Sequence, residues 1–194
     1  MDIPALGDAL PRRGSKGLRA FGTFVLSVMG WRFEGVPPNL PKLIIIVAPH
    51  TSNWDFVVAM AAALALDLRV HWLGKHTIFR RPFGAILRKL GGIPVDRSAR
   101  QGVVSQVVET FRAHDRFVLG LSPEGTRKKV ARWRTGFYNI ARAVNVPILA
   151  VALDFERKAV VIGLLFKATG DLEGDVEKMQ AFFAPIKGKW PELF

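Results

Sequence analysis

The chain has 194 residues, about the size of one ordinary domain, and is long enough to bury a substantial core. It contains no cysteine, which excludes disulfides, thiolate metal sites and a covalent acyl-cysteine intermediate. Its 28 lysine and arginine residues against 16 acidic ones give a net charge of +12, which favours anionic lipid, nucleic acid or acidic protein as a partner. No zinc-finger spacing, RNP-like segment or KH-type glycine loop accompanies this charge, so we expect no nucleic-acid partner.

The first 35 residues combine a basic run with an apolar one. Basic residues up to Arg19 precede an apolar stretch over 20–31, which is shorter than the roughly 20 residues that a helix needs to span a bilayer. No small-x-small cleavage site follows the stretch. We therefore expect residues 1–35 to form a helix in the membrane interface, with the protein peripheral or monotopic at the cytoplasmic face of the membrane. A helix packed on the domain's own core is the open alternative.

Beyond residue 35, strand-like and helix-like runs alternate along the chain. This alternation predicts one α/β domain over residues 36–194, with helices on both faces of a sheet. The last two predicted strands are close enough in sequence to form a hairpin, so we expect a mixed, mostly parallel sheet. The predicted strands are 43–48, 69–73, 93–95, 117–121, 148–155 and 159–166, and the predicted helices are 55–66, 82–90, 101–114, 136–144 and 171–183.

A candidate catalytic pair follows the first of these strands, in residues 50–55 with the sequence His-Thr-Ser-Asn-Trp-Asp. Positions i and i+5 lie about 140° apart on a helix, so His50 and Asp55 can face each other only across a strand-to-helix junction. An imidazole can take the proton of a hydroxyl, and a carboxylate bound to its other nitrogen fixes its orientation. The pair therefore suits transfer of an acyl group to a hydroxyl, with His50 as the base and Asp55 as the orienting acceptor.

A second segment, Pro-Glu-Gly-Thr-Arg at 123–127, follows the predicted strand 117–121. Segments 50–55 and 122–127 resemble the H-x4-D and P-E-G-T-R blocks of the glycerolipid acyltransferases, which include the lysophosphatidate acyltransferases. Residues 92–97, Gly-Ile-Pro-Val-Asp-Arg, and 146–149, Val-Pro-Ile-Leu, resemble two more blocks of that family in the same order. Four ordered blocks are far more specific than one, and the resemblance spans roughly residues 36–153, most of the chain.

The resemblance implies a glycerol-3-phosphate acyltransferase-like fold and an O-acyltransferase activity in phospholipid biosynthesis. The donor would be acyl-CoA or acyl carrier protein, and no other cofactor would be needed. The expected acceptor is a lysophospholipid, 1-acyl-sn-glycerol 3-phosphate, which gives phosphatidic acid. Open alternatives are the same chemistry on glycerol 3-phosphate, a lyso-aminolipid or a glycolipid, and a cationic membrane-binding protein without catalytic activity.

Three basic residues are candidates for binding the acceptor's phosphate. A guanidinium can grip phosphate oxygens in two places, and such charge-assisted bonds are strong. Arg97 is the main candidate because it ends the block at 92–97 and follows a predicted strand. Arg127 and Lys75 are further candidates for the same pocket.

The remaining candidates lie in the second segment. The resemblance implies that Glu124 positions the substrate, and its charge would also act on His50. Gly125 permits a tight backbone turn or a positive φ angle, and Thr126 can hydrogen-bond within the loop. We expect no metal, because no histidine lies in an H-E-x-x-H pattern, and no serine hydrolase, because G-x-S-x-G is absent from the sequence.

Overall fold

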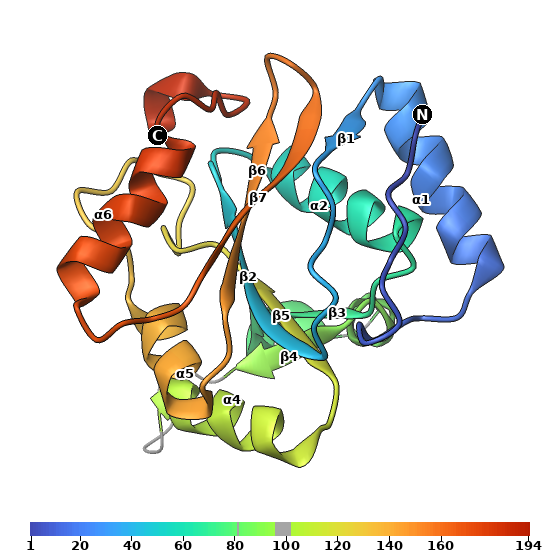
Figure 1. Cartoon of the computed structure of the whole chain (residues 1–194). Helices are drawn as coiled ribbons and strands as arrows, with labels where there is room; N and C mark the ends of the chain where they lie inside the picture. Colours follow the sequence, from blue (N-terminus) through green and yellow to red (C-terminus); the bar gives the residue numbers. More distant parts are fainter. Residues whose placement is uncertain (81, 96–101) are drawn as a thin grey trace.

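The protein is built around a seven-stranded sheet (Figure 1). The computed structural model describes residues 1–80, 82–95 and 102–194. The strand order is β1-β7-β6-β2-β5-β3-β4, and every neighbouring pair is parallel except β6 and β7. This confirms the mixed, mostly parallel α/β sheet with a terminal hairpin. The strands are β1 (Arg32–Glu34), β2 (Lys42–Ala48), β3 (Val70–Lys75), β4 (Gly92–Val95), β5 (Phe117–Leu121), β6 (Ile148–Asp154) and β7 (Ala159–Phe166).

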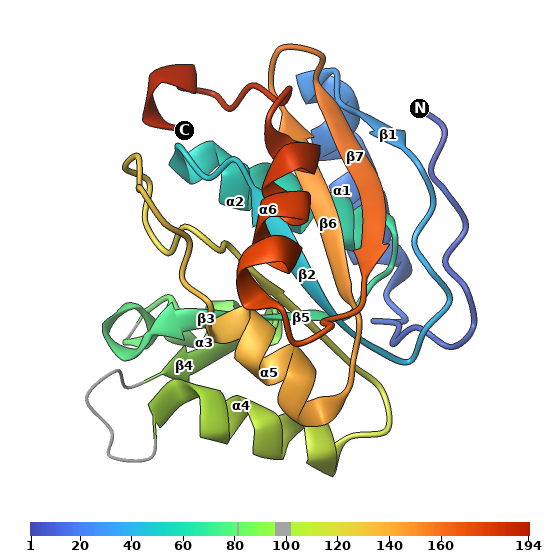
Figure 2. The ribbon, with the colours of Figure 1, turned by 60° about the vertical axis from the view of Figure 1, so that its left-hand side comes forward.

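Helices cover both faces of the sheet (Figures 1 and 2). The α-helices are α1 (Lys16–Met29), α2 (Asn53–Ala65), α3 (Gly84–Lys89), α4 (Gly102–Ala113), α5 (Gly136–Val144) and α6 (Leu172–Phe183), and short 3-10 turns form η1 (His76–Phe79) and η2 (Pro191–Leu193). Strand β1 and both 3-10 turns were not expected from the sequence. Helix α1 occupies only part of residues 1–35, which were expected to form a helix, whereas the other boundaries lie within about two residues of the predicted ones, as is usual for helix and strand ends.

The central strand β2 is buried on both of its faces. Ile44 and Ile46 face a core shared with α4, α5 and α6, whereas Leu43 and Ile45 face the opposite core beside α2 and the N-terminal segment. A strand covered on both faces reads as a continuous apolar run instead of an alternating one. The run of leucine, isoleucine and valine at 43–47 is therefore the sequence signature of a strand at the centre of the sheet.

Helix α1 packs against α2 through one of its faces only. Leu26 is fully buried, and a Cβ added at Gly22 would lie 2.6 Å from the carbonyl oxygen of Ala61, so the two helices approach closely. The opposite side of α1 leaves Phe21, Phe24 and Val28 between 58% and 71% exposed. Among the described residues, no helix combines the length and apolar character that crossing a membrane requires. Helix α1 thus packs on the domain's own core with one face and presents an apolar surface with the other.

Candidate functional site

The candidate site lies at the edge of the sheet where the parallel strands β2 and β5 end. The two strands are direct neighbours, with Ile46 paired to Leu121, so the loops that follow them leave side by side. These loops carry His50 and Glu124, as expected from the sequence. Strand β4, which forms residues 92–95 of the block at 92–97, is separated from β5 by β3. Arg97 itself lies outside the described residues.

His50 and Asp55 meet across the junction between β2 and α2, and this is the geometry that their spacing predicts. His50 Nδ1 lies 3.1 Å from Asp55 Oδ2. The imidazole remains 26% exposed, whereas the aspartate side chain is only 2% exposed. A buried carboxylate thus holds one ring nitrogen while the ring itself stays accessible to a ligand.

Asp55 is fixed by a dense set of donors. The backbone N–H groups of Thr51 and Ser52 each donate to Oδ2 at 2.7 Å, and the Ser52 hydroxyl donates to Oδ1 at 2.8 Å. Ser52 also caps α2 by accepting the Trp54 N–H at 3.1 Å, which completes a capping box with Asp55. The bonds that start the helix therefore also orient the carboxylate that holds His50. Ser52 was not among the site residues expected from the sequence, although a serine three residues before an acidic residue is the sequence signal of such a cap.

Glu124 is bound to the backbone of the histidine. Its Oε2 accepts the N–H of His50 at 2.9 Å and the hydroxyl of Ser122 at 3.2 Å. Its other oxygen, Oε1, is buried without a hydrogen-bond partner among the described residues. Burial raises the pKa of Glu124 to about 6, despite the opposing bond from His50. A buried carboxyl with a raised pKa and a free oxygen is typical of functional sites.

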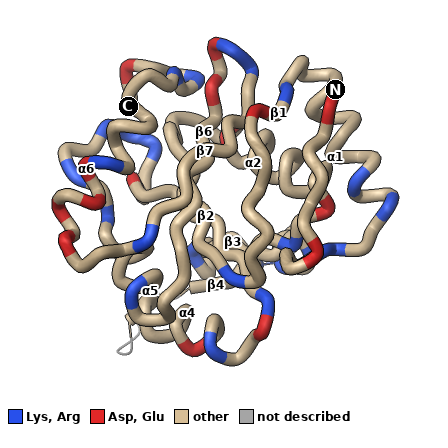
Figure 3. Tube along the Cα trace, viewed as in Figure 1, with Lys and Arg blue, Asp and Glu red and all other residues tan. Residues whose placement is uncertain are grey.

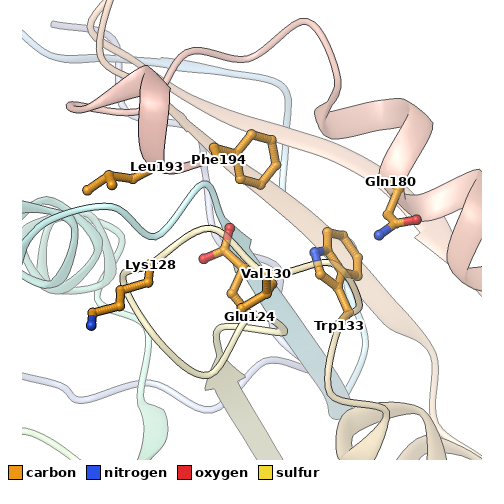
Figure 4. A pocket seen from close by; sticks show the side chains of 7 residues that line it. All are labelled: Glu124, Lys128, Val130, Trp133, Gln180, Leu193 and Phe194. Atoms are coloured by element: carbon orange, nitrogen blue, oxygen red, sulfur yellow. The ribbon is translucent and has the colours of Figure 1, made fainter.

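A pocket of about 180 Å³ opens beside this carboxyl (Figure 4). Its walls combine the loop after β5, helix α6 and the last residues of the chain. Most of its side chains are apolar. Besides Glu124, the lining residues are Lys128, Val130, Trp133, Gln180, Leu193 and Phe194.

The rest of the second segment takes the conformation expected of a tight loop. Gly125 has a φ of +65°, and a Cβ there would lie 2.6 Å from the Arg134 side chain. Thr126 accepts the backbone N–H of Lys128 at 3.4 Å, so it hydrogen-bonds within the loop. Arg127 is exposed. The positive φ explains why glycine occupies position 125.

Of the basic candidates, Lys75 and Arg127 lie in the described part of the chain, and both are exposed to solvent. Lys75 is exposed at the end of β3, two strands from β2. The loop between β5 and α5 carries a concentration of Lys and Arg (Figure 3). Exposed basic residues of this loop are Arg127, Lys128, Lys129, Arg132 and Arg134. A polar ligand entering at this edge therefore meets positive charge first.

Histidines other than His50 take no part in this arrangement. His71 stacks on Phe117 with ring centroids 4.6 Å apart, and His114 contacts the carbonyl of Thr110 at 2.9 Å. Burial, with Arg69 next in effect, lowers the pKa of His71. In the part of the chain that the structure describes, no group of histidine and acidic residues could hold a metal ion.

The C-terminal segment is the part of the site that sequence reasoning missed. Trp190 N–H donates to Thr51 Oγ1 at 3.2 Å, across 139 positions of sequence. Leu193 and Phe194 then reach the pocket beside Glu124. No local pattern in residues 184–194 signals this contact.

Comparisons with known proteins agree with this geometry. Residues 35–154 match the family described as Acyltransferase. The fold is similar to a solved structure, the 1-acyl-sn-glycerophosphate (LPA) acyltransferase PlsC from Thermotoga maritima. The TM-score is 0.61 at 19% identity, over 86% of this chain and 75% of that chain. A comparison with curated protein sequences gave no match.

The family match covers more than half of the 194 residues and contains both His50 and Asp55 as well as the segment at 123–127. At 19% identity, the structural similarity establishes the fold alone. Family match and fold agree with the four ordered blocks in the sequence. The chain belongs to the acyltransferase family.

Proposed function

We propose that this protein transfers a fatty acyl group from a thioester of coenzyme A or acyl carrier protein to the hydroxyl of a lysophospholipid. The acceptor that we infer is 1-acyl-sn-glycerol 3-phosphate, which makes the product phosphatidic acid. The observation that carries the proposal is the 3.1 Å contact between His50 Nδ1 and Asp55 Oδ2. This contact leaves Nε2 as the nitrogen available to act as a base.

The proposed reaction is direct. His50 Nε2 takes the proton of the acceptor hydroxyl as the oxygen attacks the thioester carbonyl carbon. The C–O bond forms, the C–S bond breaks, and the leaving thiolate takes the proton back from the imidazolium. A positioned base of this kind contributes roughly 10²–10⁴ to the rate. Asp55 stabilises the imidazolium while His50 holds the proton.

The proposed roles around this pair follow from position and charge. Glu124 holds the backbone of His50 and positions the substrate through its free oxygen. Arg97, Arg127 and Lys75 are proposed to bind the anionic headgroup. Gly125 and Thr126 are proposed to shape the loop between Glu124 and Arg127. The Thermotoga maritima protein of similar fold is an LPA acyltransferase, which supports lysophosphatidate over the other acceptors.

We further propose that residues 1–35 hold the protein on a membrane surface, where its lipid acceptor resides, while residues 36–194 form the acyltransferase domain. Phe21, Phe24 and Val28 of α1 are exposed in a row on the side opposite to the core contact. Lys16 and Arg19 lie on the same helix. Apolar side chains flanked by basic residues are typical of helices that lie in the interface of anionic bilayers.

The purified protein can be offered acyl-CoA or acyl carrier protein thioesters together with a panel of acceptors. The panel contains lysophosphatidate, glycerol 3-phosphate, a lyso-aminolipid and a glycolipid. We expect thiol release coupled to a new ester, detected by mass, with lysophosphatidate as the preferred acceptor. Thiol release without an ester would indicate a thioesterase, and lipid binding without any turnover would indicate a binding protein.

A further inference from the structure

The last residues of the chain lie outside the family match at 35–154 and yet cross the candidate site. After α6, the segment 186–194 runs beside the start of α2 (Figures 1 and 2). The carbonyl of Lys187 accepts the N–H of Phe155 at 2.9 Å, which ties the segment to the end of β6. The segment is therefore held against the same sheet edge as the catalytic pair.

Two further contacts fix the segment to the loop between His50 and Asp55. Gly188 lies so close to Thr51 that a Cβ added at 188 would be 2.9 Å from Thr51 Oγ1. The same hydroxyl accepts the N–H of Trp190 at 3.2 Å, and Thr51 is only 3% exposed. The N–H of Thr51 in turn donates to Asp55. One residue thus connects the orienting carboxylate to the C-terminal segment.

A cation–π contact adds a third attachment at the surface. Lys189 Nζ lies 4.7 Å from the ring centroid of Trp54, the second residue of α2. Contacts of this kind are attractive because the cation lies over the negative face of the aromatic ring. Together these contacts hold the segment against the loop between His50 and Asp55 before the chain reaches the pocket.

Beyond these attachments, Leu193 and Phe194 form one wall of the pocket, and Val130 and Trp133 form the other (Figure 4). Glu124 contributes the carboxyl, which is 5% exposed and whose Oε1 has no partner. Four apolar side chains beside a carboxyl that is bonded to the backbone of His50 match the chemistry of a hydrocarbon chain whose reacting end lies at the polar side of the pocket.

We propose that the C-terminal segment is a specificity-determining wall of the site, in which Leu193 and Phe194 contact the fatty acyl chain of a substrate. This inference rests on the proposed acyl transfer. The chain belongs either to the thioester donor or to the lysolipid acceptor, since both carry the same hydrocarbon. The Trp190–Thr51 bond keeps the wall at a fixed position relative to His50.

The test compares Leu193→Ala and Phe194→Ala with the unaltered protein. One arm varies the donor between octanoyl and palmitoyl thioesters with one acceptor, and the other varies the acyl chain of the lysolipid with one donor. We expect the ratio of kcat/KM for long and short chains to change by about tenfold in one of the arms. A change in the first arm assigns the wall to the donor, and a change in the second assigns it to the acceptor.

Leu164→Ala is the matched control, because Leu164 is a leucine of β7 that is 58% exposed and lies outside the pocket lining. It should leave both ratios unchanged. Val130→Phe narrows the pocket from the opposite wall and should shift the preference toward shorter chains. This second variant keeps the proposal testable even where a C-terminal substitution impairs folding.

A binding measurement separates this inference from the proposed function. Non-hydrolysable acyl-thioether analogues of coenzyme A and non-reacting ether lysolipids, each with a short or a long chain, raise the melting temperature according to their affinity. If the protein makes no ester from any substrate pair, the proposed function fails, but the effect of Phe194→Ala on chain-length preference in binding still tests the wall. Unchanged preferences in turnover and in binding, in variants with a native circular dichroism spectrum, would overturn the inference.

Discussion

Two buried carboxyl groups, Glu124 in the pocket and Asp175 on α6, are equally inaccessible at 5% exposure but bonded in opposite ways. Asp175 Oδ2 accepts the hydroxyl of Tyr138 at 2.8 Å, and the N–H and hydroxyl of Thr169 at 2.7 Å and 2.9 Å. These bonds tie α6 to α5. Glu124 instead leaves one of its oxygens without a partner.

The bonding shifts the two pKa values in opposite directions. For Asp175, burial alone raises the pKa, but the hydrogen bonds from Thr169 and Tyr138 outweigh it and the net pKa lies below the ordinary value. For Glu124, burial prevails and the pKa rises to about 6. Burial therefore does not by itself distinguish structure from function. A satisfied carboxylate stabilises the fold, whereas an unsatisfied one is retained at a cost in stability and is free to meet a ligand.

The largest expected effect is the loss of activity when His50 is replaced, a loss that we do not expect when Asp175 is replaced. His50→Ala removes the proposed base, so kcat/KM for acyl transfer should fall by about 10²–10⁴-fold. Stability should change little, because the imidazole is 26% exposed and the backbone N–H that donates to Glu124 is retained. Steady-state kinetics and thermal melting measure the two effects. His114→Ala, at an exposed histidine after α4, serves as the control, and equal activity of the two variants would remove His50 from the mechanism.

At Asp175 we expect the opposite result, in which stability falls and activity persists. Asp175→Ala leaves the buried hydroxyl of Tyr138 without its acceptor, so the free energy of unfolding should fall by about 2–3 kcal/mol near neutral pH. The activity of the folded protein should persist. Because the pKa of Asp175 is lowered, its stabilising contribution is present above the ordinary value of 3.8 and is lost as the pH falls through the lower folded value.

Denaturant unfolding at neutral and acidic pH measures the difference between this variant and the unaltered protein. Glu177→Ala, on the exposed side of the same helix, provides the matched control. A stability loss at Asp175 no larger than at Glu177 would contradict the structural role assigned to the buried carboxylate.

Local sequence signals predict the part of the site that lies at the junction between β2 and α2. The apolar run of β2, the capping residues of α2 and the spacing of His50 and Asp55 lie within a few residues of one another, so the sequence is sufficient to predict that they meet. Strand β1 has three residues and pairs with β7, with Arg32 opposite Ala159. So short a strand carries no periodicity, and its partner is fixed only by the tertiary fold.

The same limit explains why the C-terminal wall was not predicted. Trp190 meets Thr51 because β6 delivers the chain to the edge where β2 also ends, and α6 then returns it there. The free oxygen of Glu124 is likewise a property of what surrounds it in space. Residue type and spacing predicted that His50 and Asp55 meet, but the partners of a buried group depend on packing between distant segments.

The smallest expected effect concerns the stability that the protein loses because the buried Glu124 carboxyl has one oxygen without a partner. A pKa raised from 4.5 to about 6 means that Glu124 stabilises the folded state below pH 4.5, and that this contribution is lost as the pH rises through about 6. The loss amounts to about 2 kcal/mol. Glu124→Gln keeps an oxygen that can accept the His50 N–H but cannot ionise. As the pH rises from acidic to mildly alkaline, the difference in unfolding free energy between the variant and the unaltered protein should therefore shift by about 2 kcal/mol in favour of the variant. The acyl transfer of the variant should fall. Glu177→Gln should show neither change, and a pH-independent difference between Glu124→Gln and the unaltered protein would mean that the carboxyl at 124 is satisfied after all.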